Sequence, residues 1–424
     1  MSRATAVAAV ATVALFAAAC GDNLGPPLAS TDRRGGSITP PGCAHRVVTR
    51  LGADAPRLGD DALGPDPTPR LVRLGLVGDP RTSIAIGWRT VDEVTTAGRV
   101  RYGVVDLDRE VAALTFSYVT NFGNGDVVRM HEAHLCDLAP DTAYRYQIES
   151  GGATSPIYEF RTAPEPSPDG EITIAVAGDS RGGYDVWGRL ALELVARAPD
   201  LVVWSGDAVL LGQLQPEWDA FFAAGEPLLA RVPIAAAHGN HEVGAVNHYA
   251  QFALPGDEEH YVLDYGPIRL ITVNDSPDDP ARLDGAIRSF LTRALAQTPR
   301  APWTIVNHHR PLYSASFHGS DLGLRASWAP LFEAAGVELV INGHEHSYER
   351  THPMRGDAPG AGGPVYLVSG GAGAPLYEVG TGPWTAVAAS VHHAALVRVR
   401  PGLLQVEAFD QDGVELDRFA LVKP

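Results

Sequence analysis

Five apolar segments of this chain each end in a short polar cluster that contains Asp, Asn or His. The segments are residues 171–177, 201–204, 232–237, 303–307 and 337–341, and the clusters begin at Gly178-Asp179, Ser205-Gly206-Asp207, His238-Gly239-Asn240-His241, His308-His309 and Asn342-Gly343-His344-Glu345-His346. Loops at the carboxyl ends of strands form the crevice of an open α/β sheet, so we expect these clusters to meet at one edge. The pattern predicts an α/β domain with one shared site.

The polar side chains at this edge are ones that metal ions use as ligands. Two aspartates, one asparagine and three histidines suit a pair of hard-to-borderline divalent or trivalent ions. They are Asp179, Asp207, Asn240, His309, His344 and His346. The three cysteines of the chain leave no set of thiols for a thiolate zinc site. Two ions about 3.5–4 Å apart would bind and polarise a phosphate ester.

The order of these motifs resembles that of the calcineurin-like metallophosphoesterases. The matching blocks are Gly178-Asp179, Gly206-Asp207, Gly239-Asn240-His241-Glu242, His309-Arg310-Pro311-Leu312-Tyr313 and Gly343-His344-Glu345-His346. Tyr348-Glu349-Arg350 and a preceding strand-rich region make the chain similar to the purple acid phosphatase branch. The resemblance runs from about residue 69 to the end and implies a four-layer α/β/β/α domain over residues 169–424, including C-terminal strands at 364–370, 393–400 and 403–410.

The resemblance also implies roles for the site residues. Asp207 would bridge two metal ions of the Fe, Zn or Mn type. Asp179 and His346 would serve the first ion, and Asn240, His309 and His344 would complete the second. His241 would be the catalytic residue that helps the leaving oxygen depart.

Two histidines are further substrate-side candidates. His318 follows His309 by nine residues, which is the spacing of a substrate-contacting histidine in the family, although a solvated loop position explains it equally well. His308 either contacts the substrate or packs beside the site.

Two positions depart from the family pattern. The purple enzymes carry a tyrosine three residues after the bridging aspartate, where this chain has Leu210, so we expect no purple colour unless another tyrosine such as Tyr184 replaces it. Related phosphoesterases place a histidine two residues after the first aspartate, where this chain has Arg181. Arginine stays protonated and cannot ligate a metal, so Arg181 is predicted to clamp the substrate phosphate, with a structural salt bridge as the alternative.

The region before the α/β domain has the pattern of an all-β sandwich of fibronectin III or immunoglobulin type, over residues 69–163. Short alternating runs separated by turn residues predict strands at 71–77, 83–90, 98–104, 142–148 and 157–162. Trp88 is expected in its core and Tyr144 at a corner. No residue of this region is expected to take part in chemistry.

The N-terminal residues have the pattern of an export signal. A small-apolar run at 4–19 follows Arg3 and ends at Cys20, which predicts a signal peptide over 1–20 of the lipoprotein type, with an ordinary signal peptide as the alternative. Residues 21–68 are predicted to be a linker. Export would leave Cys43 and Cys136 either as a disulfide or as two separate thiols.

The sequence thus predicts an exported phosphoesterase, in the cell envelope of a bacterium as a lipoprotein or in its periplasm or surroundings. It would hydrolyse phosphomonoesters by attack of a metal-bound hydroxide. A phosphodiesterase or nucleotidase on the same site, and a surface binding protein with little turnover, are the alternatives. A net charge of −17 argues against nucleic acid as partner, and the membrane would be met only through a lipid anchor. The oligomeric state is left open.

Overall fold

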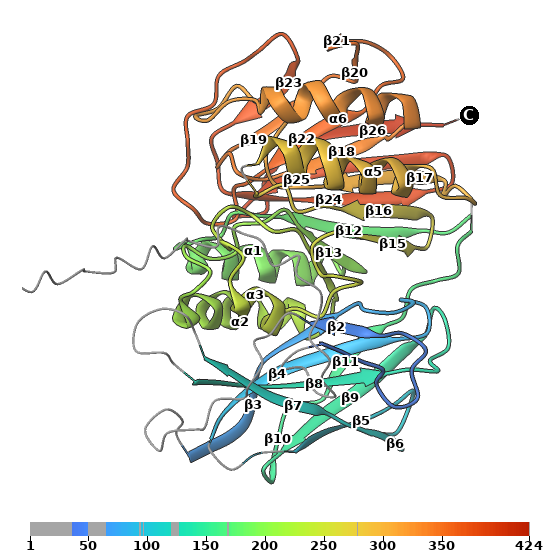
Figure 1. The fold of residues 1–424 in the computed structure, drawn as a ribbon, viewed down its shortest axis with the longest axis vertical. Coiled ribbons are helices and arrows are strands. Elements are labelled where there is room, and N and C mark those ends of the chain that lie inside the picture. Colours follow the sequence, from blue (N-terminus) through green and yellow to red (C-terminus); the bar gives the residue numbers. More distant parts are fainter. Residues whose placement is uncertain are drawn as a thin grey trace, which may run out of the picture.

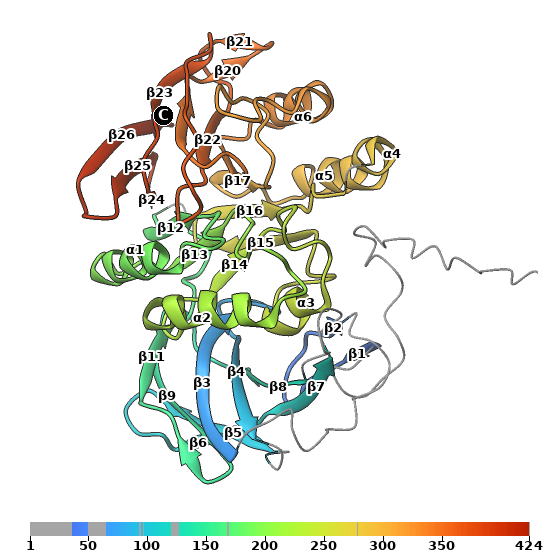
Figure 2. The same ribbon diagram turned by 90° about the vertical axis from the view of Figure 1, so that its left-hand side faces the viewer.

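The computed structural model describes residues 36–49, 65–92, 95, 97–119, 127–167, 169–277 and 279–423. A sheet-rich domain forms one end of the molecule and an α/β domain the other (Figures 1 and 2). The predicted signal peptide and much of the predicted linker lie outside the described residues. None of the described helices is long and apolar enough to span a membrane.

Two antiparallel sheets build the N-terminal domain. One has the strand order β3 (Pro65–Gly75), β4 (Ile84–Asp92), β8 (Val127–Leu135) and β7 (Leu114–Val119), and the other has β10 (Ala153–Thr154), β9 (Ala143–Ser150), β5 (Gly98–Gly103) and β6 (Arg109–Ala112), with β11 (Tyr158–Arg161) also on β9. Trp88 is fully buried and donates to Ser150 Oγ at 2.9 Å. Tyr144 Oη accepts from the Ala139 N–H at 2.9 Å, as expected of a corner tyrosine.

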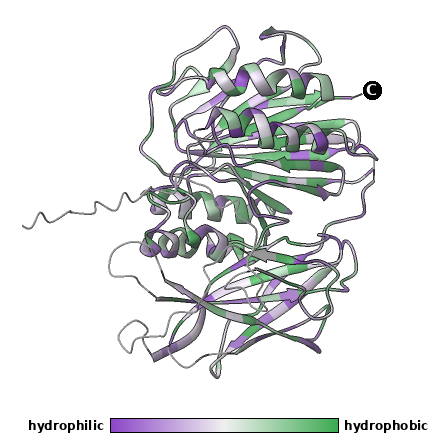
Figure 3. Cartoon of the chain, viewed as in Figure 1, coloured by the Kyte–Doolittle hydropathy of each residue, from purple (hydrophilic) through white to green (hydrophobic). Residues whose placement is uncertain are grey.

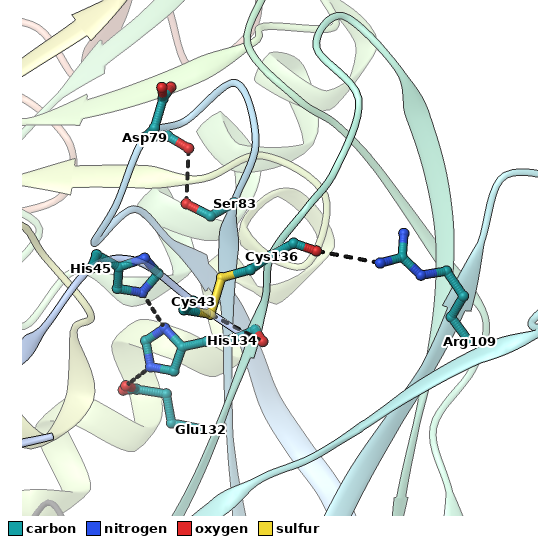
Figure 4. Close-up of a disulfide and its surroundings, with 8 residues drawn as sticks. All are labelled: Cys43, His45, Asp79, Ser83, Arg109, Glu132, His134 and Cys136. Carbon is teal, nitrogen blue, oxygen red and sulfur yellow. Dashed lines mark hydrogen bonds and ion pairs between the residues drawn. A yellow bond between two sulfur atoms is a disulfide. The ribbon is translucent and has the colours of Figure 1, made fainter. Parts of the chain in front are cut away.

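Part of the predicted linker is folded against this domain. β1 (Gly36–Ile38) and β2 (Val47–Thr49) pair antiparallel. Between them Cys43 forms a disulfide with Cys136, which follows β8 (Figure 4). Of the two alternatives for these cysteines, the structure therefore has the disulfide.

Two mixed sheets form the centre of the C-terminal domain. The first has the order β14 (Ile234–Ala236), β13 (Leu201–Trp204), β12 (Ile172–Ala177), β24 (His393–Arg400), β25 (Leu403–Asp410) and β26 (Glu415–Val422). The second has the order β15 (Tyr261–Tyr265), β16 (Ile268–Thr272), β17 (Trp303–Asn307), β18 (Leu339–Asn342), β22 (Val365–Ser369), β19 (Tyr348–Thr351) and β23 (Thr385–Ala389). A small pair, β20 (Met354–Arg355) and β21 (Ala358–Pro359), lies apart from them.

Helices cover the outer faces of the two sheets, which gives the predicted four layers. They are α1 (Tyr184–Ala196), α2 (Gln215–Leu229), α3 (Val246–Gln251), α4 (Pro280–Arg282), η1 (Leu283–Ile287), α5 (Arg288–Leu295) and α6 (Leu322–Ala335). Alternation along β17 shows how one strand serves two layers: Ile305 joins the core between the sheets, and Val306 joins the core beneath α5 and α6. Figure 3 shows the corresponding hydrophobic strands inside the domain.

The five apolar segments are the strands that position the site. They correspond to β12, β13 and β14 of the first sheet and to β17 and β18 of the second. Within each sheet these strands run parallel. Their carboxyl ends therefore lie at one edge, and the polar clusters follow directly. The predicted fold class, a sheet-rich domain followed by a four-layer α/β domain, is confirmed.

Candidate metal centre

Three of the predicted ligands have a left-handed backbone that L-residues rarely adopt. The φ angles are 60° at Asp179, 53° at Asp207 and 70° at His344. Each such residue costs on the order of 1–3 kcal/mol and persists where the surroundings over-determine it. Gly239 is one such constraint, because a Cβ there would stand 2.1 Å from Asp207 Oδ1. Strain at three of the strand-end residues marks this edge as a functional site.

The donors assigned to the second metal ion converge. His309 donates its Nδ1–H to the Ser205 carbonyl at 2.8 Å, which leaves Nε2 as the ligand nitrogen. That nitrogen lies 3.4 Å from Asp207 Oδ2 and 3.1 Å from Asn240 Oδ1. His344 Nδ1 lies 3.0 Å from the same Asn240 oxygen. Ligand atoms of Asp207, His309 and His344 lie within 4.8 Å of one another, so this set of two nitrogens and two oxygens fits a borderline cation.

The charges around this set are strongly coupled. Burial raises the pKa of Asp207, but the neighbouring His309 outweighs it and holds the pKa well below its usual value. Burial lowers the pKa of His309, but the negative charges of Asp207 and Asp179 outweigh this effect and raise the pKa to about 10. Burial and His309 lower the pKa of His344 to about 3, which keeps that imidazole neutral. These opposite shifts show that a positive charge beside the buried Asp207 carboxylate is stabilised, as that of a bound metal ion would be.

Glu242 fixes the two loops that carry Asp207 and Asn240. Its buried carboxylate accepts from the backbone N–H groups of Asp207 at 3.0 Å, Ala208 at 2.8 Å and Gly239 at 2.6 Å. Burial and the charge of Asp207 raise its pKa. Glu242 thus acts on the metal ligands through the backbone of the loops that carry them.

The donors assigned to the first metal ion are arranged differently. Asp179 accepts the His344 N–H with both carboxylate oxygens, each at 3.0 Å. His346 Nε2 lies 3.7 Å from Asp179 Oδ1, and it accepts from Arg181 Nη2 at 3.0 Å. Among the described residues, Asp179, Asp207 and His346 do not form a converging set like that of the second ion.

His241 is the predicted catalytic residue, and its side chain is 26% exposed. Its Nδ1–H is donated to the Leu210 carbonyl at 2.6 Å, and Nε2 lies 3.9 Å from Asp207 Oδ2. The Leu210 backbone carbonyl thus fixes the His241 ring. Tyr184 does not replace the tyrosine that the purple enzymes carry at the position of Leu210, because its hydroxyl donates to Glu217 and burial and Glu217 raise its pKa.

Aromatic side chains form a wall beside these groups, which we call the aromatic wall: Phe317, His318 and Tyr377. The His318 ring lies 4.4 Å from that of His344, and the Phe317 ring lies 5.1 Å from that of Tyr377. Tyr377 stacks on His346 at 4.0 Å, and its hydroxyl accepts from Arg181 at 3.3 Å. Sequence reasoning missed Tyr377, since it lies in a long loop after β22 with no motif around it.

His308 is not brought to the surface of the site. It is fully buried, its Nδ1 lies 2.9 Å from Asp275 Oδ2, and its ring packs edge-on against Trp328. A substrate cannot reach His308 in this position. Of the two alternatives for His308, the structure therefore favours packing beside the site over contact with the substrate.

Two family models match the chain. Residues 172–348 match the calcineurin-like phosphoesterases, and residues 69–162 match the purple acid phosphatase N-terminal domain.

Proteins with similar sequences come from several kingdoms. An uncharacterised protein of Mycobacterium tuberculosis is 29% identical over 65% of this chain and 60% of its own length. Purple acid phosphatase 21 of Arabidopsis thaliana is 26% identical over 72% of this chain and 71% of its own. Acid phosphatase type 7 of Homo sapiens is 27% identical over 85% and 92%. This chain thus spans about 60% of the mycobacterial relative.

A solved structure has the same fold. The purple acid phosphatase from yellow lupin seeds aligns with a TM-score of 0.75 at 20% identity, over 84% of this chain and 74% of that one.

Proposed function

Because the chain joins a purple acid phosphatase N-terminal domain to a calcineurin-like phosphoesterase domain, we propose that it is an exported, metal-dependent enzyme that hydrolyses phosphomonoesters. The observation that carries the proposal is the convergence of Asp207, His309 and His344 at the ends of three strands. Asn240 completes this set. The site can thus bind a cation next to a phosphate.

The residues fit a metal ion at one of the two positions of the family's binuclear centre. Asp207, Asn240, His309 and His344 would hold it, with two imidazoles and two oxygens as donors. When bound, the ion supplies a Lewis acid that polarises a phosphoryl oxygen and acidifies a water molecule. At the other position Arg181 already donates to the ligand nitrogen of His346.

The side chains around the cation divide the remaining work. His241 is fixed by the Leu210 carbonyl and turns Nε2 toward the opening, where its protonated form would donate to the leaving oxygen. Arg181 would hold a nonbridging phosphate oxygen with its remaining donors. The aromatic wall would contact the organic part of the ester.

The test compares nitrophenyl phosphate with bis-nitrophenyl phosphate on the purified, metal-loaded chain. We expect faster hydrolysis of the monoester, and an Asp207→Asn variant that loses metal and activity together. A preference for the bis-ester would favour the phosphodiesterase alternative. A metal-loaded chain without turnover on either ester would favour the binding protein.

Export is the second part of the proposal. The disulfide between Cys43 and Cys136 supports an oxidising compartment, because such bonds rarely persist in a reducing cytosol. We expect the mature protein to begin at a lipid-modified Cys20, which mass spectrometry of its N-terminal peptide detects. An unmodified peptide beginning near residue 20 would favour the ordinary signal peptide, and an intact Met1 would contradict export.

A further inference from the structure

Arg181 lies within the set of residues expected to bind the first metal ion. Its Nη2 donates to His346 Nε2 at 3.0 Å and to Tyr377 Oη at 3.3 Å. Its Nε lies 3.5 Å from Asp207 Oδ2, the carboxylate expected to bridge the two ions. The guanidinium therefore touches two of the three first-ion ligands, and its side chain is only 14% exposed.

The lone pair on His346 can serve only one of the two cations. The Nδ1–H of His346 is donated to the Pro375 carbonyl at 2.7 Å, which leaves a single lone pair on Nε2. In the structure that lone pair accepts from Arg181. Because a guanidinium does not lose its proton in proteins, it stays a donor and a cation at every working pH.

The surroundings hold Arg181 in this place. Its backbone N–H reaches the Asp207 carbonyl at 3.4 Å, and the preceding Ser180 hydroxyl donates to the Ala208 carbonyl at 2.8 Å. Tyr377 covers the outer side by stacking on His346. The side chain is thus anchored at its backbone and at its guanidinium.

Asp179, another residue expected to bind the first ion, forms hydrogen bonds with the backbone instead. Both of its oxygens accept the backbone N–H of His344, and its own carbonyl accepts from Ala374 at 2.9 Å. In this arrangement Asp179 fixes the left-handed turn that presents His344 to the second ion. It acts as a positioning residue.

We propose that the Arg181 guanidinium replaces the first metal ion, so that this chain binds one metal ion, at Asp207, Asn240, His309 and His344. The proposal rests on the proposed function. In place of the family's two metal ions, the active site would contain one metal ion and the guanidinium of Arg181. The guanidinium would provide the positive charge beside Asp207 that a second ion provides elsewhere. It would also offer the substrate phosphate a hydrogen-bond donor, which a bare ion does not.

The test is metal stoichiometry. The full chain is stripped with a chelator, reloaded with Mn²⁺ and analysed by elemental analysis and by electron paramagnetic resonance. We expect one Mn²⁺ per wild-type chain with the spectrum of an isolated ion. Arg181→His, which frees His346 and adds an imidazole, should bind two and show exchange coupling. Arg181→Lys keeps a cation and should stay at one.

Matched controls separate binding from folding. Arg189→Ala removes a half-exposed arginine from α1 and should stay at one ion, and Asn240→Ala should bind none or bind more weakly by at least tenfold. Circular dichroism establishes that each variant is folded.

Two coupled Mn²⁺ in the wild type would overturn the inference, even if the enzyme hydrolyses monoesters. A folded Arg181→His chain that still binds one ion would overturn it as well. One ion in the wild type, two in Arg181→His and no phosphatase activity would support the inference while contradicting the proposed function.

Discussion

A single buried carboxylate sets the geometry of the second-ion site. Glu242 accepts three backbone N–H groups: one from the metal donor Asp207 and two from Ala208 and Gly239, which adjoin the donors Asp207 and Asn240. Loss of the carboxylate would remove the acceptor of all three groups, and an unsatisfied buried donor is expensive. Its effect on the ligands is therefore indirect.

Replacing Glu242 by Gln tests this role. The amide offers one oxygen and turns an N–H₂ group toward at least one of the three donors, so we expect a loss of about 1–3 kcal/mol in the free energy of unfolding. Urea unfolding of the metal-free chain measures it, and Mn²⁺ affinity should fall with it. Glu165→Gln, at a side chain 62% exposed, is the control and should change neither. Unchanged stability of Glu242→Gln would contradict the role.

The contacts of some individual site residues could be predicted from the sequence, and those of others could not. Motif order was sufficient to bring together Asp207, His309 and His344, because strand ends meet by topology. It could not show that His308, next to His309, turns inward to Asp275, since neighbours on a strand end point to opposite sides. Nor could it show that Arg181 lies on His346, because their contact joins residues 165 apart.

At the scale of elements, two loops form the aromatic wall. The loop between β17 and α6 carries Phe317 and His318, and the long loop after β22 carries Tyr377. Phe317 is 73% exposed, and its ring contacts those of His318 and Tyr377, which lie beside the site. Its position suits contact with the organic group of a substrate.

Phe317→Ala should weaken binding of aromatic esters selectively. Loss of ring contacts worth about 0.5–1.5 kcal/mol predicts a roughly two- to thirteenfold higher KM for nitrophenyl phosphate with little change in kcat. The KM for glycerol phosphate should stay the same. Leu322→Ala, at an exposed residue that opens α6, is the control. An equal change for both esters would show that Phe317 acts on loop structure instead.

The disulfide connects the β1–β2 pair to the end of β8 across 93 residues of sequence (Figure 4). Closing a loop of that length restricts the unfolded chain, so the double variant Cys43→Ser, Cys136→Ser should lose about 2–4 kcal/mol of unfolding free energy. Urea unfolding without reductant measures this. Activity at 25 °C should persist, because the bond lies in the N-terminal domain; a loss of metal from the folded variant would contradict this.

Elements were predicted where the local pattern was simple. The five predicted strands of the N-terminal domain are present, whereas β6, β7, β8 and β10 were not predicted. Of these, β8 buries Arg129, His131, Glu132 and His134. Strand alternation read from apolar residues cannot detect such a strand. His131 contacts the hydroxyls of Thr90 on β4 and Thr115 on β7, and Glu132 pairs with His134 within β8 itself. The sequence does not reveal these contacts.

At the scale of the whole molecule, buried neutral histidines make stability depend on pH. His131 lies between the hydroxyls of Thr90 and Thr115 and stacks on Trp88. Burial, together with Arg129, lowers its pKa to about 4, while Asp92 opposes this. A histidine whose pKa is depressed on folding contributes fully above about pH 6.5, and the contribution is lost as the pH falls toward 4.

For His131 alone this predicts a loss of about 2 kcal/mol between pH 7.5 and pH 5. Urea unfolding at the two pH values measures the difference, which should be smaller in His131→Gln. The control is His352→Gln, at an exposed position, which should keep the wild-type difference. An identical pH dependence in His131→Gln and the wild type would contradict the prediction.

The net charge of −17 acts at this largest scale and not at the site. It disfavours polyanions approaching from a distance, whereas Arg181 and a bound ion would govern the potential felt by a small phosphate.

The two domains are in contact over α2 and α3. Glu226 on α2 accepts from the Leu71 N–H at 3.0 Å and from the Tyr158 hydroxyl at 3.0 Å, and Tyr146 donates to the Ala230 carbonyl at 2.6 Å. These interdomain contacts, and not only the connecting peptide, hold the two domains together. A chain cut by protease near residue 168 should migrate as one particle in a native gel and as two fragments in detergent, with its hydrolytic activity intact.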